Sequence, residues 1–132
     1  MKSTLTAAGL ALIALTAGAQ AQEDAGRKEY MVACAVCHGE SGKGDGPFAP
    51  ILNISVPSLT GLSAANDGAF PFLEAFMMID GRTKMRAHGS PMPVWGDRYS
   101  DSAADTYGPY GTEVVTRGRI LSLVYYLESI QE

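Results

Sequence analysis

The chain has 132 residues, which is the length of one domain, and no segment repeats at a fixed period. Its formal net charge of −4 argues against a nucleic-acid-binding protein, because such a protein needs a basic patch. Apolar residues make up 46% of the chain, which is sufficient for a small hydrophobic core.

The first residues have the pattern of a secretory signal peptide. Lys2 provides a positive start, residues 5–17 are mostly apolar, and the sequence Ala-Gln-Ala at 19–21 is a small-x-small cleavage site. An uncleaved membrane anchor is the alternative, but the apolar run is shorter than the roughly 20 residues of a spanning helix. We therefore expect a leader over 1–21 that is removed on export, and a domain over 22–132 in a bacterial periplasm. Loss of Lys2 would take the net charge from −4 to −5.

A helix is predicted over residues 24–38. Asp24 can cap it, and Tyr30, Cys34 and Cys37 fall near one face at spacings of four and three. The stretch that follows, as far as Gly61, is rich in glycine and proline and predicts loops with a short turn.

A second helix is predicted to begin near Pro71, which suits a first helical turn. Phe72, Phe76 and Ile79 repeat at helical spacing, and Gly81 stands where the helix should end. The segment after Gly81 contains two prolines around a methionine and predicts an ordered loop. A polar, acidic loop is expected to follow it.

The clearest element is a helix predicted from Thr112, a possible cap, to about Ile130. It carries an apolar stripe formed by Ile120, Leu123, Val124, Leu127 and Ile130. No convincing strand is present, so we expect a small, all-α, loop-rich protein. Such long loops are unusual in a compact domain. They suggest that something other than side chains fills the centre.

Both cysteines lie in the sequence Cys34-Ala-Val-Cys37-His38, and three chemistries compete for it. A redox disulfide fits the spacing and an oxidising compartment. A thioredoxin-like site, however, belongs to a βαβ pattern, which is missing here. A structural zinc site needs four ligands. Cys34, Cys37 and His88 could provide three, and His38 is poorly placed to join the same tetrahedron.

The third chemistry is covalent haem, because Cys-x-x-Cys-His is the c-type attachment pattern. Two thiols on one helical turn can each add to a vinyl group at the haem edge, and the following imidazole then lies under the iron. Both cysteines would then form thioether bonds rather than a disulfide, and the haem would be the core around which the loops fold. We therefore predict one haem c, attached through Cys34 and Cys37 and bound at its iron by His38.

The second axial ligand must come from elsewhere, and the candidates are Met77, Met78, Met85, His88 and Met92. Met77 and Met78 are expected to pack in the core, and charged neighbours favour an exposed Met85. His88 is the main rival, because imidazole also binds haem iron. Met92 is favoured, because Pro91 and Pro93 restrict the backbone on both sides. Nearby, Trp95 offers apolar bulk and an N–H that could reach a haem propionate.

An iron with His38 on one side and Met92 on the other has no open position. Oxygen or peroxide chemistry needs one, whereas a saturated His/Met haem suits the passage of single electrons, and methionine raises its potential. We therefore expect an electron-transfer protein rather than an enzyme.

These motifs resemble those of a class I c-type cytochrome, in particular the small mono-haem periplasmic cytochromes of bacteria. The sequence "CAVCHG" is similar to the family's attachment site, "SPMPVWG" to its methionine loop, and "GRILSLVYYLESIQ" to its C-terminal helix. The resemblance extends over residues 24–131. It implies a loop-rich helical cytochrome c fold wrapped around one covalently attached haem.

Carried over residue by residue, the resemblance implies four haem-binding residues: Cys34, Cys37, the proximal ligand His38 and the distal ligand Met92. Gly26 and Tyr30 correspond to the crossing of the family's first and last helices. Pro50 lies in the stretch where the family often has a proline near the proximal histidine. The loop over 97–111 is longer than in the shortest members and acidic, as expected of a docking surface or of a solvated insertion.

The function expected from these observations is a monomeric periplasmic electron carrier between respiratory or dehydrogenase partners. Electrons would pass through the haem edge near the thioethers, and the membrane would be reached only through partner complexes. The negative charge favours basic or apolar partner faces, although Lys43, Lys84 and Arg86 could form a local basic patch. One alternative is a haem subunit of a larger dehydrogenase complex. The other is an open-iron protein with peroxidase-like or gas-binding activity.

Overall fold

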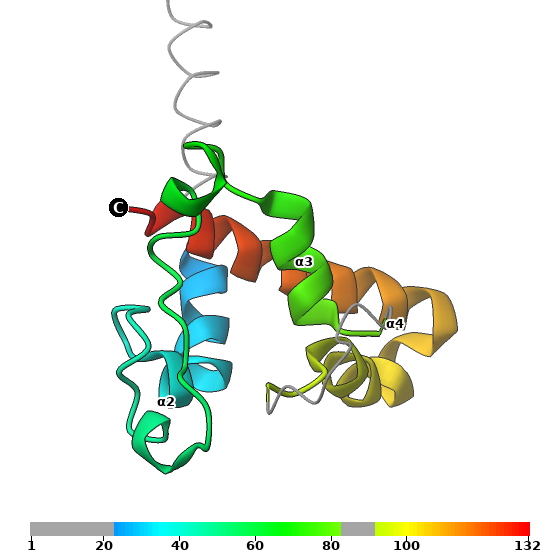
Figure 1. The fold of residues 1–132 in the computed structure, drawn as a ribbon. Helices are drawn as coiled ribbons and strands as arrows, with labels where there is room; N and C mark the ends of the chain where they lie inside the picture. The colour runs from blue at the N-terminus through cyan, green and yellow to red at the C-terminus, as the bar shows by residue number, and fades with distance from the viewer. Residues whose placement is uncertain (1–22, 83–91) are drawn as a thin grey trace, which may run out of the picture.

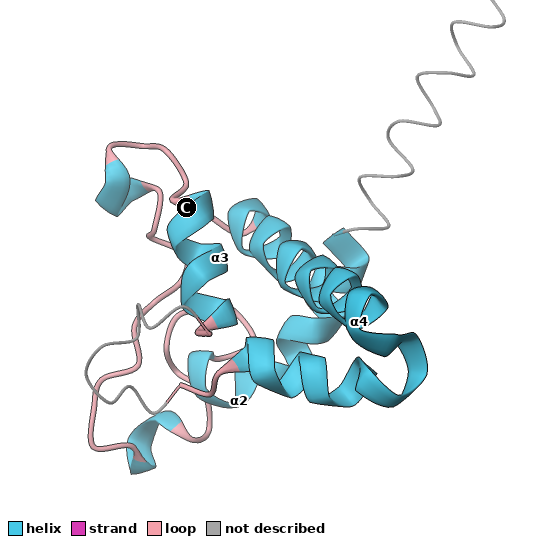
Figure 2. Ribbon diagram, turned by 90° about the vertical axis from the view of Figure 1, so that its right-hand side faces the viewer, coloured by secondary structure: helices cyan, strands magenta, loops and turns pink. Residues whose placement is uncertain are grey.

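The computed structural model describes residues 23–82 and 92–132, and these residues form only helices and loops (Figures 1 and 2). The predicted all-α fold is therefore confirmed, while the predicted leader over 1–21 lies outside the described residues. The described elements are a helix over residues 23–33, α2 (Ala35–His38), η1 (Ala49–Ile51), η2 (Ala64–Asn66), α3 (Phe72–Asp80) and α4 (Trp95–Ser129).

The helix over residues 23–33 packs against the C-terminal half of α4 (Figure 1). A Cβ atom at Gly26 would overlap the carbonyl oxygen of Ser122, so only glycine permits this approach of the two backbones. One turn later the rings of Tyr30 and Tyr126 meet with centroids 5.2 Å apart. The expected crossing of the first and last helices at Gly26 and Tyr30 is confirmed.

Helix α3 also follows its predicted pattern. It begins after Pro71 and ends at Asp80, with Gly81 in the left-handed conformation. Ile79 is buried in the core, and the rings of Phe72 and of Tyr125 on α4 form an edge-to-face pair with centroids 5.1 Å apart. This packing holds α3 beside α4, where part of the surface of α3 lines a cavity.

The predicted loop over 97–111 is wrong, because most of this stretch belongs to α4. Figure 2 shows α4 bending, and the non-helical residue within it is Gly108, with φ 63° and ψ 176°. Pro109 follows directly and starts the next helical segment. Proline has no backbone N–H, which costs little at this position because the helix has already been interrupted at Gly108. Tyr99 and Ala103, in the first part of α4, are buried. The polar composition therefore reflects the exposed face of a helix.

Two predicted helix caps are also wrong. Asp24 lies within the helical residues, and Thr112 lies inside α4, where it is buried. The apolar stripe predicted for this helix is nevertheless correct, because Ile120, Leu123, Val124 and Leu127 are all buried in the core. None of the helices within the described ranges is both long and apolar enough to cross a membrane.

Candidate functional site

A cavity of about 530 Å³ opens beside the C-terminal half of α4. Its size lies within the roughly 300–1,000 Å³ typical of ligand and cofactor sites. Most of the lining is apolar and comes from the loop over 52–62, α3 and α4. The chemically distinctive side chains in this lining are Cys34, Cys37, His38, Glu74, Met78, Met92 and Trp95. The structure thus places all four predicted haem-binding residues around one cavity.

The two cysteines and the histidine are held on a single turn. The backbone N–H of Cys34 donates to the carbonyl of Tyr30 at 2.8 Å, which continues the first helix as far as the turn at Cys34. The Cys34 carbonyl then accepts from Cys37 at 3.1 Å and from His38 at 2.9 Å. Both cysteines are free thiols and half-buried. This geometry presents the two sulfur atoms and the imidazole to the same cavity.

The environment of Cys34 does not suit a redox-active thiol. Burial, with smaller contributions from the nearby charges of Glu29 and Cys37, raises the pKa of the Cys34 thiol to about 12. Reactive thiols of disulfide-exchange enzymes instead have lowered pKa values, because the thiolate is the nucleophile. A thioredoxin-like site also requires a strand, and residues 23–82 and 92–132 contain only helices and loops.

His38 is oriented by one backbone contact. Its Nδ1 lies 3.2 Å from the carbonyl oxygen of Pro57, which can only accept a hydrogen bond, so Nδ1 carries the proton and Nε2 is left as the basic nitrogen. Burial lowers the pKa of the imidazole, while the Pro57 carbonyl acts in the opposite direction. The lowered pKa favours the neutral ring, which is the form that binds a metal.

The proline that contacts His38 is therefore Pro57 and not Pro50. Pro50 belongs to η1, is exposed and is absent from the cavity lining. Pro57 lies within the loop that returns along α2, where the Leu59 N–H donates to the Gly42 carbonyl at 2.7 Å. His38 and Pro57 are 19 residues apart and meet only because this loop folds back. Sequence spacing alone therefore does not distinguish Pro57 from Pro50.

The candidates for a second axial ligand fall into three groups. Met92 lines the cavity, as predicted, and Met77 does not. Met78 was expected to be a core residue, but it is 44% exposed and also lines the cavity. Met85 and His88 lie outside the described residues. Two described methionines therefore compete for the same role.

A sequence signal for Met78 does exist. Pro71, Glu74, Ala75 and Met78 repeat at helical spacing and all line the cavity. Ile79 lines it too, although its side chain is otherwise buried in the core. The stripe of Phe72, Phe76 and Ile79 predicts the helix but not the second stripe that contains Met78.

Trp95 is held in the cavity wall by its neighbours on α4. Its ring centroid lies 5.7 Å from that of the buried Tyr99, and the Arg119 guanidinium sits 3.9 Å from the Tyr99 ring centroid. Arg119 also donates two hydrogen bonds to the carboxylate of Glu29, at 2.8 and 3.0 Å. This stack connects the cavity wall to the first helix.

The donor set fits a haem better than a zinc ion. Within residues 23–82 and 92–132, no group of three or more His, Cys, Asp or Glu side chains is arranged to hold a metal ion. A haem instead needs two thiols at one edge, an imidazole, a second ligand and an apolar enclosure. The cavity lining contains all of these.

Comparison with known protein families identifies cytochrome c. The family model described as cytochrome c matches residues 23–106, which is more than half of the chain. The match includes the paired cysteines, His38, Met78 and Met92. Comparisons with curated proteins and with solved structures find no match.

Proposed function

Because the chain belongs to the cytochrome c family, we propose that it is a periplasmic single-electron carrier with one haem c. The family implies covalent haem and electron transfer. In the proposal, Cys34 and Cys37 form the thioether bonds, and His38 and Met92 bind the iron from opposite sides.

One observation carries this proposal: Cys34, Cys37, His38 and Met92 line the same largely apolar cavity. A bound haem would supply an iron that gains and loses a single electron. The chain's own residues would hold it in place and exclude water. Pro57 would keep the Nε2 atom of His38 available, and the thioether of Met92 would favour the ferrous state.

The cellular setting of the proposal rests on the leader pattern and the charge. A cleaved leader over 1–21 would export the chain, and loss of Lys2 with it would leave a net charge near −5. Partners with basic or apolar faces would suit this charge. The proposed basic patch is weakened at Lys43, whose ammonium group is paired with Glu132 at 2.8 Å.

The test is an optical spectrum of the haem-loaded protein and of two matched variants, Met92→Ala and Met78→Ala. The wild type should show a weak far-red sulfur-to-iron band when ferric, and it should not bind carbon monoxide when ferrous. Met92→Ala should lose the band, bind carbon monoxide and have a lower potential, because an axial sulfur ligand has been removed. Met78→Ala should keep the wild-type spectrum.

Each of the other outcomes would indicate a different sixth ligand, or none. Loss of the band in Met78→Ala alone would assign the sixth ligand to Met78. Ready binding of carbon monoxide by the wild type would indicate an open iron and would favour peroxidase-like or gas-binding activity. A wild type with neither the band nor carbon monoxide binding would point to His88.

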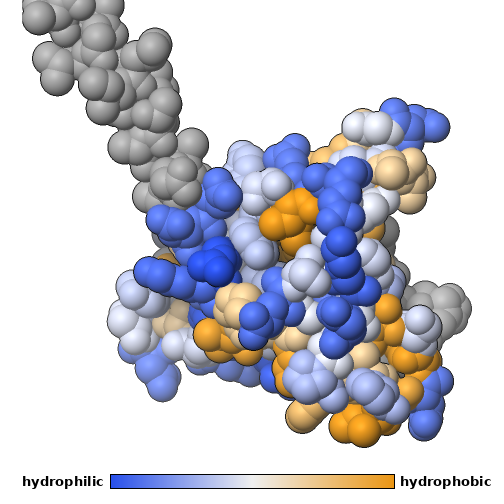
Figure 3. Space-filling model, turned by 90° about the vertical axis from the view of Figure 1, so that its left-hand side faces the viewer, coloured by the Kyte–Doolittle hydropathy of each residue, from blue (hydrophilic) through white to orange (hydrophobic). Residues whose placement is uncertain are grey.

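A second candidate function, as the haem subunit of a larger complex, is favoured by the exposed apolar surface. Figure 3 shows hydrophobic side chains gathered toward the lower edge of one face of the molecule. Phe48 and Ile51, at η1, are 51% and 71% exposed, and Val32 is 86% exposed. Fractionation of a native extract, followed by haem staining, separates the two functions. A carrier should elute at the mass of the monomer, and a subunit should elute in a larger assembly.

A further inference from the structure

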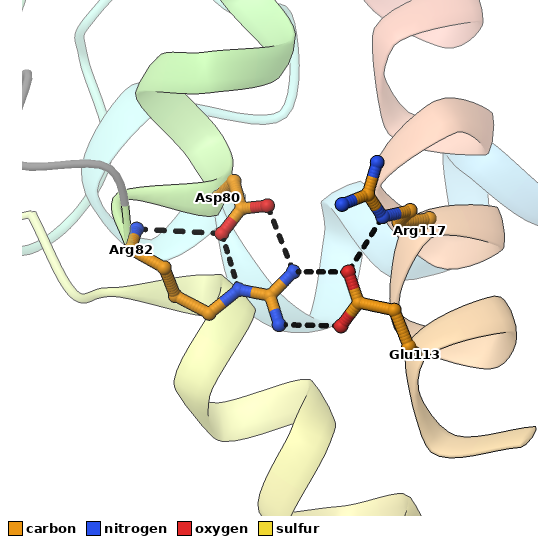
Figure 4. Close-up of polar contacts among 4 residues, drawn as sticks. All are labelled: Asp80, Arg82, Glu113 and Arg117. Carbon is orange, nitrogen blue, oxygen red and sulfur yellow. Dashed lines mark hydrogen bonds and ion pairs between the residues drawn. The ribbon is translucent and has the colours of Figure 1, made fainter. Parts of the chain in front are cut away.

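Four charged side chains join the end of α3 to the second half of α4 (Figure 4). We call Asp80, Arg82, Glu113 and Arg117 the Arg82 network. Arg82 is its centre, because its guanidinium donates to Asp80 at 2.6 and 2.9 Å and to Glu113 at 2.8 and 3.3 Å. Arg117 contacts only Glu113 within the network, from the outer side.

The network is partly removed from solvent, so its bonds are stronger than those of an ordinary surface pair. Asp80 is only 6% exposed, and the side chain of Arg82 is 24% exposed. Loss of the Arg82 charge would leave the Asp80 carboxylate buried without a cation, which is far more costly than loss of a surface ion pair. Arg117, with a side chain 64% exposed, stands at the rim.

The first turn of α4 rests directly on this network. A Cβ atom at Gly96 would lie 2.6 Å from Nε of Arg82 and 2.7 Å from the carbonyl oxygen of Asp80, so a larger residue would force the two segments apart. Met92 and Trp95, which line the cavity, precede Gly96 by four residues and by one. The network therefore fixes the end of the short segment that carries Met92.

We propose that Arg82 is a positioning residue for the iron ligand Met92, acting through its contact with Gly96. This inference rests on the proposed function, in which Met92 binds the iron. Dissociation of Met92 requires the segment before Gly96 to move away from the cavity. Arg82 opposes this movement, because Gly96 cannot shift without disturbing the charged hydrogen bonds beneath it.

The test measures how fast imidazole replaces Met92 on the ferric haem, since imidazole can bind only after the methionine has left. The variants are Arg82→Gln and Glu113→Gln, with Arg117→Gln as the control, because it has the same change of charge as Arg82→Gln but does not touch Arg82. Arg82→Gln should accelerate the limiting rate about tenfold or more, and Glu113→Gln about threefold. Arg117→Gln should stay within about twofold of the wild type.

A purely structural role for the network would give a different result. In that case Arg82→Gln would lower the free energy of unfolding but leave the imidazole rate and the sulfur-to-iron band unchanged, which would overturn the inference. If Arg82→Gln does not fold, the rate for Glu113→Gln decides between the two roles. If the wild type lacks the band, the proposed His/Met ligation fails. If the wild type shows the band but both variants behave like the control, only the positioning role fails.

Discussion

Substitution of Gly26 by alanine tests the packing that brings the first helix and α4 together. The added methyl group would overlap the carbonyl oxygen of Ser122 and lie 2.7 Å from its carbonyl carbon and 2.8 Å from Cβ of Tyr126. None of these atoms can rotate away, because two belong to the backbone and the third is fixed to it. The two helices would have to separate.

The size of the effect follows from two opposing contributions. Alanine in place of a helical glycine stabilises a helix by about 0.5–1 kcal/mol. Overpacking of a tight contact costs about 1–3 kcal/mol, and the upper end applies where backbone must move. We therefore expect Gly26→Ala to lower the free energy of unfolding by about 2 kcal/mol. This corresponds to a decrease in Tm of about 10 °C for a domain of this size.

The assay is urea unfolding of the haem-loaded protein, with Gly118→Ala as the matched control. Gly118 also lies in a helix, but a Cβ atom there would have no neighbour within 4 Å, so its substitution should stabilise by about 0.5–1 kcal/mol. The two alanine variants should thus change stability in opposite directions. A Gly26→Ala protein as stable as Gly118→Ala would refute the argument from close backbone approach.

Two further predictions concern the thiols and the Arg82 network. Replacement of both Cys34 and Cys37 by alanine should abolish covalent attachment, so haem staining should vanish after denaturing electrophoresis; a stained band would contradict the proposed thioethers. Arg82 and Arg117 lower the pKa of Glu113 from 4.5 to about 2, so this carboxylate stabilises the fold above pH 4.5, and the stabilisation is lost as the pH falls towards 2. The stability difference between the wild type and Glu113→Gln should therefore be constant above about pH 5 and shrink below it; a gap that widens on acidification would contradict the assigned pairing.

The sequence by itself determined the features that depend only on interactions between residues close together in the chain. One helical turn suffices to bring Cys34, Cys37 and His38 to the same side, so their spacing was enough to predict a shared site. The apolar stripe from Ile120 to Leu127 predicted the buried face of α4, and Gly81 marked the end of α3. Each of these inferences needs only the helical repeat or the conformational preference of one residue.

The stretch over 97–111 shows where local patterns mislead. Its polar, acidic residues indicated a loop. In the structure only Gly108 has a non-helical conformation, which is enough to admit Pro109, and the helix continues on both sides. Burial of Tyr99 and Ala103 favours the helix over a loop, because contacts with distant segments outweigh weak local preferences.

Only the tertiary structure decided which distant residues meet. Pro57 rather than Pro50 reaches His38 because the loop after α2 folds back along it, and Met78 joins Met92 at the cavity because α3 turns its second face there. Arg82 pairs with Glu113, which is 31 residues further along the chain, once α3 and α4 have packed. Such pairings depend on how elements are oriented in space, and a pattern read along one segment carries no information about that orientation.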